Sequence, residues 1–101
     1  MLALRDVIRE NRRILTRRLA QLLPGTYIVP AEATFVVWVD YSGLGLSDAA
    51  LAALLEKALF IGDPGSEYGA SNQFYRYSIA VPTWALEKSL DYLETTLKEA
   101  T

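Results

Sequence analysis

The chain has no cysteine and no histidine among its 101 residues. Without cysteine it has no disulfide framework, no thiolate metal site and no cysteine nucleophile. Without histidine it lacks the commonest general base, and with it the Ser-His and Cys-His arrangements of nucleophilic catalysis. Carboxylates are plentiful, but no pair of them stands out as an acid–base couple. We therefore predict no catalytic and no metal-binding residue in this chain.

Long apolar runs and a strong net charge are missing too. No stretch approaches the roughly 18 apolar residues that a membrane-spanning helix needs, and no apolar segment follows the N-terminal arginines as it would in a signal peptide. The net charge of −2 gives no general attraction to nucleic acid or membrane. We therefore expect neither partner, and a cytoplasmic location by default. Six arginines within the first 18 residues would suit a nucleic-acid helix, but without interleaved aromatic residues we interpret them as a solvated face.

The chain's length corresponds to one small domain, residues 1–101. Its hydrophobic fraction of 51% suits a folded domain with some apolar surface left for a partner. Apolar residues at three- and four-residue spacing predict a helix over 3–23 that ends at Pro24-Gly25. Strands are predicted over 26–29 and 34–40, and both faces of the second strand are apolar, so we expect both to be covered.

The second half of the chain contains two more predicted helices around a strand. Ser47 is expected to cap a helix with a buried stripe formed by Leu51, Leu54, Leu55 and Ala58. A brief strand is expected over Leu59 to Ile61, before Gly62-Asp63-Pro64-Gly65 breaks it. After a strand over 74–80, Thr83 is expected to cap a last helix with one apolar face, formed by Leu86, Leu90, Leu93 and Leu97. This order predicts an α+β fold: a small, mainly antiparallel sheet with helices packed on it.

The stretch from Pro64 to Pro82 contains an arginine in an unusual place. Gly65 and Gly69 indicate a loop, and the strand after it alternates its side chains between two faces. Arg76 lies in the middle of this strand, where its guanidinium needs an anion or water because it cannot lose its proton. Its planar fork suits a carboxylate. A structural alternative is an edge-strand arginine that reaches solvent or pairs with an acidic side chain, Asp63 and Glu67 being the candidates.

Two segments carry a family resemblance. The glycine-rich loop, the strand Phe-Tyr-Arg-Tyr-Ser-Ile-Ala-Val-Pro (74–82) and the following helix resemble the C-terminal end of fold-type I pyridoxal-phosphate enzymes. The likeness is closest to the class I/II aminotransferases and their cystathionine β-lyase-like (C–S lyase) branch. The run from Pro30 to Ser47 is similar to the family's small-domain strand and turn. The resemblance implies that residues 1–101 are a C-terminal small domain and a fragment of a larger enzyme.

The resemblance also implies roles for particular residues. Arg76 matches the arginine that binds the α-carboxylate of the amino-acid substrate, and Tyr68 lies in a loop that lines the substrate entrance. The Schiff-base lysine, the partner of the pyridinium nitrogen and the phosphate site belong to the family's large domain. Lys57, Lys88 and Lys98 are therefore expected to be solvated charges, and this chain alone is expected to hold no pyridoxal phosphate and to be inactive. The implied partners are the amino acid, the large domain and a second subunit.

Three positions depart from the family pattern. Ser78 replaces a frequent asparagine, Val81-Pro82-Thr83 replaces a frequent Cys-Pro-Arg, and the loop 70–73 has less glycine. The sequence does not choose between aminotransferase and lyase, nor does it name the amino acid. An alternative from another class is a free-standing α+β binding or regulatory module that self-associates through an apolar sheet face.

Overall fold

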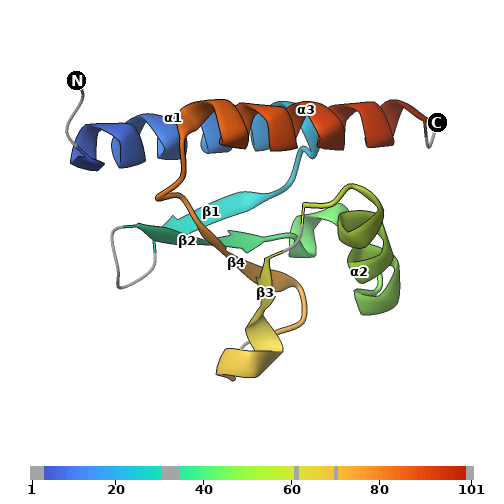
Figure 1. The fold of residues 1–101 in the computed structure, drawn as a ribbon. Coiled ribbons are helices and arrows are strands. Elements are labelled where there is room, and N and C mark those ends of the chain that lie inside the picture. Colours follow the sequence, from blue (N-terminus) through green and yellow to red (C-terminus); the bar gives the residue numbers. More distant parts are fainter. Residues whose placement is uncertain (1–3, 31–34, 61, 70, 100–101) are drawn as a thin grey trace.

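The computed structural model describes residues 4–30, 35–60, 62–69 and 71–99 (Figure 1). In chain order, the elements are α1 (Leu4–Leu22), β1 (Tyr27–Pro30), β2 (Val36–Asp40), the 3₁₀ helix η1 (Ser42–Leu44), α2 (Asp48–Lys57), β3 (Asp63–Pro64), the 3₁₀ helix η2 (Gly65–Tyr68), β4 (Phe74–Ser78) and α3 (Thr83–Glu99). The four strands form one sheet in the order β1-β2-β4-β3, and all three pairings are antiparallel. The predicted α+β fold is confirmed.

The sheet has two different faces because side chains alternate along β2 and β4. Val37 and Val39 lie opposite Tyr77 and Tyr75 in the register, and all four belong to the core or pack against it. The intervening residues, Trp38 and Arg76, also lie opposite each other and point to the second face.

Helices α1 and α3 run side by side over the first face of the sheet (Figure 1). The leucine spacing that predicts each helix also provides its buried stripe. The core combines these stripes with residues from α2 and the strands: Ile14, Leu15, Leu19, Leu23, Val37, Val39, Tyr41, Leu51, Leu55, Ala58, Phe60, Tyr75, Ile79, Leu86, Leu90 and Leu93. The prediction that both faces of β2 are covered holds fully for the face with Val37 and Val39, which are completely buried. On the other face Val36 is buried and Trp38 is intermediate in exposure, so that face is covered only in part.

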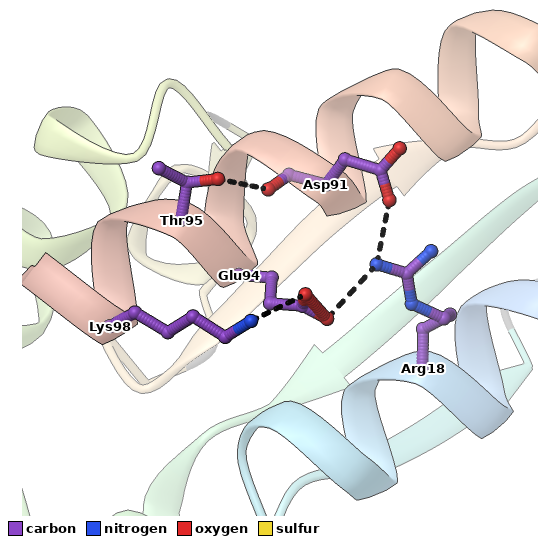
Figure 2. Close-up of polar contacts among 5 residues, drawn as sticks. All are labelled: Arg18, Asp91, Glu94, Thr95 and Lys98. Carbon is purple, nitrogen blue, oxygen red and sulfur yellow. Dashed lines mark hydrogen bonds and ion pairs between the residues drawn. The ribbon is translucent and has the colours of Figure 1, made fainter.

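An ion-pair cluster joins α1 to α3 at the edge of their contact (Figure 2). The Arg18 guanidinium lies 2.9 Å from Asp91 Oδ1 and 3.8 Å from Glu94 Oε1, and Lys98 Nζ lies 3.3 Å from Glu94 Oε2. Most of the Arg18 side chain is buried, as expected for a long stem beside an apolar stripe. Because the acidic partners are largely exposed, the pairs orient the helices more than they stabilise them.

The helix ends confirm one predicted cap and correct another. The Ala50 backbone N–H donates to Ser47 Oγ at 3.1 Å, so Ser47 caps α2 as predicted. Thr83 is the first residue of α3, and its hydroxyl donates to Asn11 Oδ1 at 2.8 Å. The predicted capping role of Thr83 is therefore wrong, because its hydroxyl joins a contact between helices.

The predicted strand at Leu59 and Phe60 is also wrong, and Ile61 lies outside the described residues. Leu59 has a φ of +55° and follows the last turn of α2. The Phe60 N–H donates to Leu55 O, and the Leu59 N–H donates to Glu56 O. This is the hydrogen-bond pattern of a Schellman motif, in which a left-handed residue ends a helix. Pairing with β4 begins only at Asp63, as the short strand β3, and β4 itself ends at Ser78 rather than at residue 80.

Within the described parts of the chain, no helix combines the length and the apolar character that crossing a membrane requires.

Candidate functional site

Arg76 lies inside the sheet rather than at its edge. Its strand, β4, runs between β2 and β3, with Trp38 on one side of Arg76 and Asp63 on the other. The edge position considered from the sequence is therefore wrong, whereas the exposure and the pairing with an acidic side chain that the same alternative predicted are both observed. The side chain is 34% exposed, and it points to the face of the sheet opposite α1 and α3 (Figure 1). A guanidinium in this position is accessible to an anion that approaches this open face.

Asp63 is the acidic partner that the structure places beside Arg76. Arg76 Nη2 donates to Asp63 Oδ2 at 3.1 Å, and about half of the Asp63 side chain is exposed. Of the two counter-ions considered from the sequence, the structure brings Asp63 to the guanidinium. The side chain of Glu67 lies outside the described residues. A half-exposed ion pair of this kind is weak in water, so another carboxylate can compete with Asp63 for the guanidinium.

Gly62 allows β3 to approach β4 closely. A Cβ atom at this position would lie 2.6 Å from the carbonyl oxygen of Arg76 and 2.8 Å from the Tyr77 ring. The backbone oxygen cannot move without breaking the strand pairing, so only glycine fits here. The glycine therefore positions Asp63, the next residue, directly opposite Arg76.

The residues around Arg76 combine one cation with apolar side chains. The register aligns Val29, Trp38, Arg76 and Asp63 across the four strands. Strand alternation places Phe74 on the same face, two residues before Arg76. This arrangement suits a small molecule with a carboxylate, which the guanidinium fork would bind by two charge-assisted hydrogen bonds, and with an apolar part that contacts the indole.

Tyr68, the second residue predicted to contact substrate, ends the 3₁₀ helix η2. This helix follows β3 directly, and its last turn closes at Gly69, whose N–H donates to the carbonyl oxygens of Gly65 and Ser66. The backbone of Tyr68 thus lies in the segment that follows Asp63 in the chain. Its side chain lies outside the described residues, so its predicted contact with substrate stays a prediction.

Sequence analysis missed a buried asparagine that supports the end of β4. Asn11 is fully buried on α1, and its Nδ2 donates to the carbonyl oxygens of Ile79 at 2.9 Å and Val81 at 2.7 Å. Its Oδ1 accepts the Thr83 hydroxyl. One side chain thus holds the whole connection from β4 to α3. The burial of Asn11 could have been predicted from its position. It lies three residues after Ile8 and four before Leu15, and therefore on the apolar stripe of the helix.

A pair of buried tyrosines supports β4 from the core side. The hydroxyl oxygens of Tyr41 and Tyr77 are 2.8 Å apart, and the Tyr77 hydroxyl donates to the carbonyl oxygen of Phe60 at 3.1 Å. Since that bond uses the Tyr77 proton, Tyr41 is the donor between the two hydroxyls. Burial raises the pKa of the Tyr41 hydroxyl, and burial with the neighbouring Tyr41 raises the pKa of Tyr77. These groups stay neutral and serve the structure.

The lysines and the acidic side chains of the described residues show no site for a metal ion. Lys57, Lys88 and Lys98 are exposed on α2 and α3, as expected for solvated charges. Among the residues described, no group of three or more acidic, histidine or cysteine side chains is arranged to hold a metal ion. Arg76 and its neighbours on this sheet face form an arrangement that suits an anionic ligand.

No protein-family model matches the chain. Among curated proteins it is 31% identical, over 77 residues, to cystathionine beta-lyase PatB from Bacillus subtilis (strain 168); the match covers 74% of this chain and 20% of that protein. It is 27% identical over 92 residues to LL-diaminopimelate aminotransferase from Aquifex aeolicus (strain VF5), covering 90% of this chain and 23% of that protein. The fold matches that of cystalysin from Treponema denticola, a structure that contains pyridoxal 5′-phosphate. The TM-score is 0.80 and the sequences are 26% identical, and the match covers 95% of this chain and 25% of the cystalysin chain.

The sequence and the fold therefore lead to the same family. The chain spans about a fifth to a quarter of the length of these relatives. Its α+β fold and its sequence are those of one part of a fold-type I pyridoxal-phosphate-dependent enzyme, in the group that contains aminotransferases and C–S lyases.

Proposed function

We propose that this chain is the small domain of a pyridoxal-phosphate-dependent aminotransferase or C–S lyase, in which Arg76 binds the α-carboxylate of the amino-acid substrate. The observation that carries the proposal is the position of Arg76. Its guanidinium lies on the sheet face opposite α1 and α3 (Figure 1), and it is partly exposed beside the half-exposed carboxylate of Asp63 on β3. Similarity to a lyase and to an aminotransferase supports the reaction class.

The described residues do not fit pyridoxal phosphate itself. A Schiff-base lysine has to be desolvated to be reactive, whereas Lys57, Lys88 and Lys98 are exposed on helices α2 and α3. Arg76 lies on β4, between Trp38 and Asp63. In this proposal the cofactor is held by the rest of the enzyme, and the chain contributes a group that binds substrate. On its own it has no activity and no bound cofactor.

Arg76 would act by binding and orienting the substrate. Two parallel N–H···O bonds from a planar guanidinium fix both the distance and the plane of a carboxylate. The opposite end of the amino acid is thereby directed away from the sheet, toward the part of the enzyme that holds the cofactor. Such orientation contributes several kcal/mol to the lowering of a reaction barrier, even though Arg76 takes no part in bond breaking.

The test is Arg76→Lys in the enzyme that carries this chain. Lysine keeps the charge but loses the bidentate geometry, and a lost hydrogen bond to a charged group raises the amino-acid KM by about 10- to 100-fold. Arg17→Lys is the matched control, because Arg17 is an exposed arginine on α1; this variant should keep the KM. Thermal unfolding of both variants checks that they fold alike. An Arg76→Lys enzyme with an unchanged KM would remove Arg76 from the substrate site.

A further inference from the structure

The strand that carries Asp63 is held only weakly by its own backbone. β3 consists of Asp63 and Pro64, which lie opposite Arg76 and Tyr75 of β4. Proline has no backbone N–H, so one of the two residues cannot donate a hydrogen bond to the ladder. The side chains that contact the segment before Asp63 therefore help to decide how its carboxylate meets the guanidinium.

Tyr77 contacts that segment from the core side of the sheet. It follows Arg76 in β4, so strand alternation directs its side chain to the opposite face. Its hydroxyl donates to the carbonyl oxygen of Phe60 at 3.1 Å, and the two rings pack with their centroids 4.7 Å apart. The same ring lies against Gly62, where an added Cβ would come within 2.8 Å of it. One side chain thus contacts the chain at two points just before Asp63.

Phe60 is a fixed point at the end of α2. Its N–H donates to the carbonyl oxygen of Leu55 at 3.0 Å, and its own carbonyl oxygen accepts from Tyr77. Phe60 is buried, so without the tyrosine donor this oxygen would be left unsatisfied away from water. Burial raises the pKa of the Tyr77 hydroxyl, so the donor keeps its proton at neutral pH. The chain therefore leaves Phe60 toward β3 in a defined direction.

Tyr41 supplies the other hydroxyl of the buried pair, and its hydrogen bonds lead elsewhere. Its hydroxyl donates to the Tyr77 oxygen at 2.8 Å, and its backbone N–H donates to the carbonyl oxygen of Gln73, the residue before β4. Its ring meets the Tyr75 ring edge-on, with centroids 5.8 Å apart. Without the Tyr41 hydroxyl, Tyr77 can still donate to Phe60. The two tyrosines are therefore separable by substitution.

We propose that Tyr77 is a positioning residue of the carboxylate site. By its bond to Phe60 it holds Asp63 against Arg76, and so limits the affinity of the guanidinium for other anions. This inference deepens the proposed function and rests on it, because the anion that has to replace Asp63 is the substrate carboxylate. The Tyr77 hydroxyl itself contacts no substrate in this proposal, because it lies on the core side of the sheet and acts through Asp63.

The test is a double-mutant cycle on the purified chain, with acetate as the probe and the NMR signal of the Arg76 side-chain N–H as the readout. Tyr77→Phe loses the bond to Phe60. We expect its acetate affinity at constant ionic strength to rise by about two- to fivefold, the range that loss of an exposed ion pair allows. In the Asp63→Asn background the same change should have no effect, since the competing charge is already gone. Before acetate is added, the Arg76 signal of Tyr77→Phe should shift toward that of Asp63→Asn.

Tyr41→Phe is the matched control, because it removes a buried hydroxyl of the same pair and leaves the bond from Tyr77 to Phe60 in place. It should lower the stability of the chain and leave both the acetate affinity and the Arg76 signal unchanged. Where Tyr77→Phe does not fold, Tyr41→Phe/Tyr77→Phe tests the same point, since it leaves no buried tyrosine hydroxyl without its acceptor.

Three results would overturn the proposal: an acetate affinity that Tyr77→Phe leaves unchanged or lowers, an equal gain in the Asp63→Asn background, or an equal gain in Tyr41→Phe. The last would mean that the pair acts only through the stability of the core. Failure of the proposed function looks different. An Arg76→Lys enzyme with an unchanged KM removes Arg76 from the substrate site. In a chain whose Arg76 signal does not respond to acetate, the acetate-free shift in Tyr77→Phe still decides whether Tyr77 positions Asp63.

Discussion

Arg76 is the residue on which the proposed function depends, and its guanidinium already binds one carboxylate. The Asp63 carboxylate accepts a hydrogen bond from Arg76 Nη2 at 3.1 Å. A substrate carboxylate approaching the open face would meet the same donors. In this account, Asp63 is a competitor that keeps the guanidinium oriented until a carboxylate arrives.

Replacement of Asp63 should therefore strengthen anion binding. In Asp63→Asn the competing charge is lost, and an exposed ion pair of this kind accounts for about a two- to fivefold change in affinity. The affinity of the chain for acetate, followed by the NMR signal of the Arg76 side-chain N–H at constant ionic strength, should rise by this factor. Asp91→Asn, which removes one of the two acidic partners of Arg18, should leave the acetate affinity unchanged. Weaker acetate binding in Asp63→Asn would mean that the two side chains bind the ligand together.

The two buried tyrosines make the stability of the chain depend on pH in the alkaline range. The pKa values of Tyr41 and Tyr77 are both raised in the folded chain, whereas in the unfolded chain a tyrosine has a pKa of about 10. Above that pH the unfolded state loses protons that the folded state keeps. Stability is therefore fully present below about pH 10 and falls as the pH rises further, by up to about 1.4 kcal/mol per pH unit for each tyrosine.

Urea unfolding at a series of alkaline pH values measures this slope. The double variant Tyr41→Phe/Tyr77→Phe should show a flatter decline of the unfolding free energy than the unchanged chain. Tyr92→Phe, at a tyrosine that is half exposed, should keep the original slope. Equal slopes in all three proteins would show that the buried hydroxyls do not control alkaline unfolding.

At the scale of secondary-structure elements, Asn11 couples α1 to the connection between β4 and α3. Asn11→Leu removes three hydrogen bonds and leaves the carbonyl oxygens of Ile79 and Val81 buried without this donor. We expect a loss of about 2–4 kcal/mol in the free energy of unfolding. Thr83→Val removes only one of these bonds and should cost about 1 kcal/mol. Chemical denaturation of both variants measures the difference, and an Asn11→Leu chain as stable as Thr83→Val would contradict the coupling.

The elements that the sequence predicts well are those with a long periodic pattern. The leucine spacing places α1 within a residue or so of its observed ends, and the Ser47 cap marks the start of α2. The short elements were not predictable in this way. Leu59 adopts a left-handed conformation for which a leucine gives no signal, and β3 exists because Gly62 lets two residues approach β4. Both depend on contacts between segments that are distant in sequence.

The candidate site was predictable only in part. Arg76 stood out as a charge in an apolar strand, and Asp63 was one of two candidate partners. The order of the strands decides that Arg76 is internal and faces away from the helices, and nothing local in the sequence encodes that order. The supporting residues Asn11 and Tyr77 act through hydrogen bonds across the core, which a linear pattern does not reveal.

At the scale of the whole molecule, the described helices cover one face of the sheet and leave Arg76 on the other. The chain spans about a fifth to a quarter of the length of its relatives, and its lysines are exposed on α2 and α3. In the proposed function, Arg76 binds the substrate carboxylate and another part of the enzyme supplies the chemistry.

The most direct test is the size and colour of the native gene product. We expect a protein several times larger than 11.2 kDa that contains this chain and absorbs visible light as a pyridoxal Schiff base does. A colourless native product of about 11.2 kDa would contradict this expectation, since the fold would then be kept without the chemistry of the family.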